Sequence, residues 1–339
     1  MNRALVTPAA AALLLVGSMV SAPAMLAHYR QLTPYHSHIH RIGSPTPDSL
    51  ILNASFENGL ADSNNRYGNT SRMRSGTGAL QVTASSTEYQ ETGGSTGGTT
   101  VISADWATYN ISKGPYWAYN STWNKGSLVN GKDFTQSLTL DNVNFPNGSV
   151  LAWSFPNTPG PNNVYSAPCL MFGTYAQVVA PTPTIPYKQI SAINTLMVTH
   201  NVTLNSDPTK FDAIYDFYLQ SSTDTSSQGL FEIELHMHTP QYFIDWINTS
   251  LKKYDFTDAA GTDWIIASNP GVNPPMIIFV RADFADHLNA TVDLKALLMA
   301  AKAKGLLTGN EYFTGLAMAV EPREGSGSMT INSLSVTYD

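Results

Sequence analysis

The sequence predicts an all-β fold, a jelly-roll sandwich of two sheets with one helix packed on its convex face. Short runs in which apolar and polar residues alternate recur along the chain, with Asn, Gly and Pro between them, as in sandwiches and jelly rolls. Charged residues make up only 13 % of the chain, while the residues that many turns require are plentiful. The expected strands are residues 117–123, 135–140, 150–155, 190–204, 213–220, 230–238, 276–280, 316–321 and 330–337.

One stretch has the period of a helix. Apolar residues recur from Val292 through residues 294–298 and 300–303, and Gly305 follows at a place where glycine commonly ends a helix. We therefore expect a single helix at about residues 292–304.

The start of the chain resembles an export signal. Arg3 supplies a positive charge, an apolar run follows at residues 9–20, and residues 22–24 are small, as a signal peptidase requires. The run is too short to cross a bilayer core of about 30 Å comfortably. We expect residues 1–24 to be a cleaved signal peptide and the protein to be secreted, free of the membrane. A retained membrane anchor is the alternative.

The rest of the chain divides into three parts. Residues 25–49 contain histidines and prolines and are expected to be a linker, with a metal-binding tract as the alternative. Residues 50–100 are expected to form N-terminal strands or a small appended module. Residues 101–339 are expected to form the jelly roll.

Charge and cysteine content limit the partners and the origin. The net charge of −7 argues against a nucleic-acid partner, because no basic patch can displace counterions from phosphates. Cys169 is the only cysteine, so no intrachain disulfide forms and a large core must hold the fold. We expect an exported monomer of bacterial origin.

The run at residues 231–238 contains candidate catalytic residues. Alternate side chains of a strand share a face, so Glu232, Glu234, His236 and His238 are expected on the side opposite the core. Asp216 and two tyrosines lie in the preceding strand. Carboxylates and aromatic side chains on one concave face suit a sugar cleft, whereas on an ordinary exterior face they are only solvated polar residues.

A further carboxylate ends an almost wholly apolar strand. Glu321 follows residues 316–320 and precedes Pro322. Partial burial there would raise the pKa of its carboxyl, which suits a general acid. An ordinary strand-end charge in water is the alternative.

Several segments, in their order, resemble glycoside hydrolase family 12, the endoglucanases and xyloglucan hydrolases built on a β-jelly roll. The resemblance covers about residues 101–339, with the expected helix placed before Glu321 as in the family. The segments that carry it are Tyr116-Trp117-Ala118-Tyr119-Asn120-Ser121-Thr122-Trp123-Asn124, Trp153-Ser154-Phe155, Asn163-Val164-Tyr165-Ser166-Ala167-Pro168, Tyr215-Asp216, Phe231-Glu232, Tyr312-Phe313-Thr314-Gly315, Glu321-Pro322 and the closing residues 329–336.

The resemblance implies a retaining β-1,4-glucanase with two catalytic carboxylates and a β-glucan as partner. Glu232 would be the nucleophile, Glu321 the acid and base, and Asp216 would orient the nucleophile, with His236 in support. No metal or organic cofactor is needed. The residues implied in substrate binding are Trp117, Asn120, Trp123, Trp153 and Tyr165, although a large aromatic residue in a sandwich is more often part of the core.

The chain departs from the family pattern after Glu232. The family's run there is apolar and ends in Trp, whereas this chain has Glu234 and His236. Because Glu232 and Glu234 share a face, a shift of two residues would make Glu234 the nucleophile. The preceding aromatic residue and the spacing to Asp216 favour Glu232.

Two other functions fit the same residues. One is a carbohydrate-binding sandwich without catalysis. The other is a polysaccharide lyase that uses His236, His238 and Arg281, although the negative net charge disfavours a polyanionic substrate.

Overall fold

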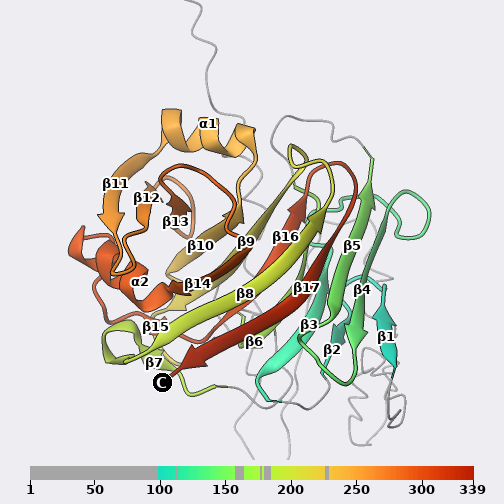
Figure 1. Cartoon of the computed structure of the whole chain (residues 1–339), viewed down its shortest axis with the longest axis horizontal. Coiled ribbons are helices and arrows are strands. Elements are labelled where there is room, and N and C mark those ends of the chain that lie inside the picture. Colours follow the sequence, from blue (N-terminus) through green and yellow to red (C-terminus); the bar gives the residue numbers. More distant parts are fainter. Residues whose placement is uncertain (1–97, 111–113, 157–163, 176–177, 179–184, 226–228) are drawn as a thin grey trace, which may run out of the picture.

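The computed structural model describes residues 98–110, 114–156, 164–175, 178, 185–225 and 229–339. Two sheets, one of six strands and one of eleven, lie one over the other (Figure 1). The expected signal peptide, the linker and nearly all of the expected segment 50–100 lie outside the described residues. Within the described part, no helix is both long and apolar enough to cross a membrane.

The smaller sheet has the order β1-β4-β5-β17-β8-β14 and is antiparallel throughout. Its first strand begins before the expected start of the jelly roll at residue 101. Its strands are β1 (Thr99–Ile102), β4 (Thr135–Asp141), β5 (Ser149–Phe155), β8 (Leu196–Asn205), β14 (Asn289–Asp293) and β17 (Gly325–Tyr338).

The larger sheet has the order β11-β12-β13-β10-β9-β16-β6-β3-β2, and the short strand β15 pairs with β9 and with a second short strand, β7. Among the described strands of this sheet, only β10 and β13 pair in parallel. Its strands are β2 (Thr108–Tyr109), β3 (Tyr116–Ser121), β6 (Ala167–Gly173), β7 (Lys188–Gln189), β9 (Phe211–Gln220), β10 (Phe231–His238), β11 (Lys252–Thr257), β12 (Asp263–Asn269), β13 (Met276–Arg281), β15 (Tyr312–Phe313) and β16 (Gly315–Pro322).

The all-β jelly-roll prediction is confirmed. Alternation along the strands puts Phe217 of β9, Ile233 of β10 and Met318 of β16 into one core between the sheets. We call the opposite side of the larger sheet its outer face. The expected strand 190–204 is interrupted, because Ile190–Ala192 form a 3-10 helix before β8 begins at Leu196.

The expected helix is present as α2 (Leu294–Ala303). It begins later than the sequence suggested because β-branched Val292 and the following Asp293 still belong to strand β14. Asp293 caps the helix, since its Oδ1 accepts a hydrogen bond from the Ala296 amide at 2.9 Å. Leu294 and Leu298 enter the core between the sheets.

The prediction of a single helix is wrong, because α1 (Gln241–Ser250) is a second helix in the described residues. Its buried Ile247 packs on Met276 and Ile278 of β13 and Ala267 of β12. Ile278 pairs with Glu234 in the ladder, so α1 covers the outer face of the sheet beside β10. At the far side of this region, β11 pairs with β12 alone among the described strands and forms an edge of the sheet.

Candidate functional site

The outer face of β10 carries a row of buried acidic and basic side chains. Glu232, Glu234 and His236 alternate with Ile233 and Leu235, which point into the core. Glu232 is 6 % exposed and Glu234 only 2 %. They are therefore not the solvated polar residues of an ordinary exterior face.

The prediction that His238 shares this face is wrong. A bulge between His236 and His238 shifts the register, so that His238 lies opposite Ala213. Its ring packs on the core residue Phe211, with centroids 4.9 Å apart. Its nitrogens contact Asp286 Oδ1 and the Pro208 carbonyl oxygen, both at 2.8 Å. Burial lowers the pKa of His238, but Asp286, the Pro208 carbonyl and the charge of Asp212 together outweigh it, and the pKa is raised.

The neighbouring strands add three more carboxylates to the outer face. Asp216 of β9 lies directly opposite Glu234 of β10. Asp212 of β9 lies opposite Glu321 of β16, which is 7 % exposed. The adjacent strands β10, β9 and β16 thus bring together a carboxylate cluster: Asp212, Asp216, Glu232, Glu234 and Glu321.

Three of these carboxylates have hydrogen-bond partners. The Tyr218 hydroxyl donates to Glu232 Oε1 at 3.0 Å, and the Tyr175 hydroxyl donates to Asp216 Oδ2. His236 Nε2 lies 2.9 Å from Glu234 Oε2. Within the described part of the chain, one buried oxygen of Asp216 and one of Asp212 have no partner, so polar groups there remain to be satisfied.

Burial makes these carboxyls hard to ionise. It raises the pKa of Asp212 and of Asp216 to about 7 each, and that of Glu234 to about 8. Burial, with the charges of Asp216 and Glu234, holds the pKa of Glu232 well above its usual range. Such raised values are typical of sites that exchange protons near neutral pH.

Glu321 has the surroundings of a general acid. Burial raises its pKa well above the ordinary value, and the charges of Asp212, Glu234, Asp216 and Glu232 add to the effect in that order. The alternative of a strand-end charge in water does not fit this burial. The Arg323 guanidinium nearby lies over the Tyr242 ring of α1, 3.7 Å from its centroid.

The residues expected to bind substrate are placed differently. Trp117 is on the outer face but only 1 % exposed, and its indole N–H donates to the Gly173 carbonyl oxygen at 2.7 Å. Trp123 is half-buried. Asn120 is fully buried, where its amide donates to the Ala104 carbonyl oxygen and accepts from Gln136.

Trp153 and Tyr165 are two of the residues expected to bind substrate. The structure places both in the core between the sheets instead. Trp153 packs on Phe211, with centroids 5.2 Å apart. Tyr165 stacks on Phe155 at 4.7 Å. The sequence analysis allowed for this outcome, since aromatic residues of a sandwich are often core.

Sequence reasoning missed several residues of the site. Asp212 could have been found, because it alternates with Asp216 on one strand. Of the two tyrosines noted on that strand, Tyr218 donates to Glu232 in the cluster, whereas Tyr215 lies in the core between the sheets. Tyr175 and Tyr242 come from segments whose position over the cluster no local pattern reveals.

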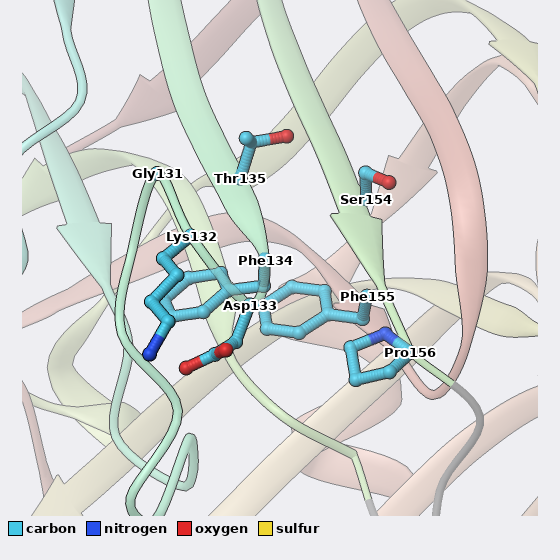
Figure 2. A pocket seen from close by; sticks show the side chains of 8 residues that line it. All are labelled: Gly131, Lys132, Asp133, Phe134, Thr135, Ser154, Phe155 and Pro156. Carbon is cyan, nitrogen blue, oxygen red and sulfur yellow. The ribbon is translucent and has the colours of Figure 1, made fainter.

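A pocket that none of the clustered carboxylates lines lies at one end of β4 and β5 in the smaller sheet. Figure 2 shows the rings of Phe134 and Phe155 side by side there, with Pro156 next to Phe155. Both rings are nearly buried and are stacked at 4.7 Å, so they offer little surface to a ligand. Among the described residues, no group of three or more His, Cys, Asp and Glu side chains could hold a metal ion.

The sequence matches no protein-family model and no curated protein. The structure resembles a metagenome-derived glycoside hydrolase family 12 endoglucanase, with a TM-score of 0.57 and 16 % identity over 71 % of this chain and 99 % of that one. The chain has the fold of glycoside hydrolase family 12. Endoglucanase 3 of Trichoderma harzianum shares this family 12 fold with a TM-score of 0.54 and 18 % identity, over 73 % of this chain and 100 % of that one. A family 12 xyloglucanase from Bacillus licheniformis is similar with a TM-score of 0.55 and 15 % identity, over 71 % of this chain and 100 % of that one.

Proposed function

We propose that this protein is a secreted, retaining endo-β-1,4-glucanase that hydrolyses cellulose, xyloglucan or mixed-linkage glucan. The proposal depends on one observation. On a family 12 fold, three adjacent strands bring Glu234, Asp216 and Glu321 together as buried carboxyls on one face. The structural neighbours include endoglucanases and a xyloglucanase, which supports a β-glucan substrate.

The strand register supports Glu234, rather than Glu232, as the nucleophile. Glu321 lies opposite Asp212, while Glu234 lies opposite Asp216 and Glu232 opposite Tyr218. Along the strands, Glu234 is therefore four residues from the level of Glu321 and Glu232 is six, a difference of about 7 Å at 3.4 Å per residue. A retaining pair needs carboxyls about 5–5.5 Å apart, which favours the nearer of the two carboxylates. This reverses the preference drawn from the sequence.

The mechanism uses these two carboxyls in two displacements. Ionised Glu234 attacks the anomeric carbon while protonated Glu321 gives its proton to the departing glycosidic oxygen. The Glu321 carboxylate then takes a proton from water, which displaces Glu234 and leaves the anomeric configuration unchanged. Asp216, opposite Glu234, orients the nucleophile. The raised pKa of Glu321, caused first by burial, suits the acid of the first step.

The lyase alternative finds less support. Arg281 would have to neutralise a uronate, but its guanidinium makes two hydrogen bonds to Asp283, at 3.0 and 2.7 Å. It lies on β13, which borders β10 but pairs with neither β9 nor β16.

The proposal is tested by incubating the secreted protein with soluble β-1,4-glucan. We expect new reducing ends, no absorbance from unsaturated sugars, and β-anomers as the first products in a proton NMR time course. Unsaturated products would indicate a lyase, and binding without new reducing ends would indicate the carbohydrate-binding alternative. Intact-mass analysis of the secreted protein tests the loss of residues 1–24.

A further inference from the structure

His236 makes a buried contact with the proposed nucleophile. Its Nε2 is 2.9 Å from Glu234 Oε2, and the two side chains are 0 % and 3 % exposed. Phe243 of α1 packs on the imidazole, with ring centroids 4.5 Å apart. The contact is thus fixed by packing and shielded from water. In such a dry interior a hydrogen bond is stronger than in solvent.

Burial disfavours an ionised Glu234. β13 contributes only apolar side chains at this point, Met276 and Ile278. Burial raises the pKa of Glu234 to about 8 and lowers that of His236 to about 4. The titratable and charged groups nearby are Asp212, Asp216, Tyr175 and Tyr218, Glu232 and His238 of β10, Glu321 and Arg323, Tyr242 of α1, and His287 behind the strand.

We propose that His236 is a positioning residue for Glu234. Its neutral imidazole donates the Nε2–H to Oε2 of the ionised carboxylate and leaves Oε1 free to attack the anomeric carbon. This rests on the proposed function and on Glu234 as nucleophile. A donor to an ionised carboxylate makes a charge-assisted bond, so it offsets part of the cost of burying that charge.

The proton of this hydrogen bond stays on His236 Nε2 through both displacements. In the first, the Oε1–carbon bond forms, the glycosidic bond breaks, and the leaving oxygen takes the proton of Glu321. Glu234 loses its negative charge when it becomes an ester, which weakens the hydrogen bond from His236. It strengthens again when water, losing a proton to Glu321, displaces Glu234. His236 therefore lowers the pH at which Glu234 becomes a nucleophile.

The experiment compares His236→Leu, which has no donor, with His236→Gln, which retains a side-chain N–H. The acidic limb of kcat/KM against pH, measured on an aryl β-cellobioside, reports ionisation of the nucleophile in the free enzyme. A hydrogen bond to a charged group corresponds to about one to two pH units. We expect His236→Leu to move the limb upward by about that amount, and His236→Gln to restore most of the shift.

Two measurements keep the test decisive. Tyr218→Phe removes the matched hydrogen bond to Glu232 and should leave the limb in place. A 2-fluoro glycoside should label Glu234, which peptide mass analysis identifies, with the same pH shift in His236→Leu.

An unmoved limb in folded His236→Leu, with Glu234 still labelled, would overturn the positioning role alone. A limb that responds to Tyr218→Phe instead, or a label on Glu232, would overturn it together with the assignment of Glu234. A wild-type protein that neither hydrolyses glucan nor takes the label would refute the proposed function itself.

Discussion

Two neighbouring halves of the same outer face differ completely in what they carry. Over β10, β9 and β16 the face bears the carboxylate cluster. Over β13 and β12 it bears Met276, Ile278, Val280 and Ala267. Both halves are buried, but α1 covers the second one with Ile247.

The difference shows that one alternating pattern can serve two purposes in a single sheet. Apolar side chains on the outer face need a protein cover, because exposing them to water is costly. Buried carboxyls need polar partners instead, and two of them have an unpartnered oxygen in the described region. Phe243 marks the border, since it contacts both His236 and the apolar half.

The largest expected effect lies in the carboxylate half. Glu234→Gln removes the proposed nucleophile with little change in volume, so turnover of β-1,4-glucan should fall by several powers of ten while the protein stays folded. Glu232→Gln is the matched control on the same strand and should lose less. Steady-state rates measure both, and a reversed ranking would restore Glu232 as the nucleophile.

Glu321→Gln should remove the proton donor. Turnover of glucan should again fall by powers of ten, but an aryl glycoside whose leaving group needs no proton should be affected much less in the first step. The ratio of the two losses is the measurement. Equal losses on both substrates would exclude Glu321 as the acid.

In the apolar half the expected effect is on stability. Ile247→Ala empties a fully buried position under α1, which typically costs about 2–5 kcal/mol in the free energy of unfolding. Urea denaturation measures the loss. Asn248→Ala, at the exposed neighbouring position, should change it by no more than about 0.5 kcal/mol. Equal effects would mean that α1 does not cover the sheet.

The carboxylate half should make stability fall as pH rises from about 6.5 to 8. Burial raises the folded-state pKa of Asp212 and Asp216 to about 7 and of Glu234 to about 8. These carboxyls keep protons that the unfolded chain has already released, so their contribution is lost as pH passes those values.

The buried histidines act at lower pH. Burial lowers the pKa of His236 and of His287 to about 4, so their contribution to stability is complete above about pH 6.5, the unfolded value. Urea midpoints at pH 6.5 and 8 test the trend, and Asp212→Asn should flatten it. A protein that gains stability over this range would contradict the burial of the cluster.

The smallest effect belongs to α2, on the core side of the sheet. Asp293→Ala removes the N-cap hydrogen bond to the Ala296 amide, which should cost about 1 kcal/mol. Thermal unfolding measures it, and Asp293→Asn should retain most of the stability. An Ala variant as stable as the Asn variant would show that the cap contributes little.

The sequence predicted the sandwich and the orientation of Glu232, Glu234 and His236, because alternation along a strand is a local property. It could not predict that His238 leaves the face, since a bulge depends on the partner strand. It missed α1, whose Tyr242-Phe243-Ile244 start has β-forming residues and no side-chain cap.

Long-range neighbours explain the other differences. Whether Trp153 contacts a sugar or packs on Phe211 depends on which residues the opposite sheet places against it. The choice between Glu232 and Glu234 likewise depends on the register of β9 with both β10 and β16, which no single segment specifies.

The edge strand β11 also bears on how the protein behaves in concentrated solution. An exposed sheet edge invites pairing with the edge of another molecule, the first step of aggregation. β11 carries Lys252 and Lys253 as exposed residues, with Asp255 two positions farther along. Charged side chains on an edge strand, lysines above all, discourage such pairing. The sheet can therefore extend well past the carboxylate cluster without ending in an edge that readily pairs with other protein molecules.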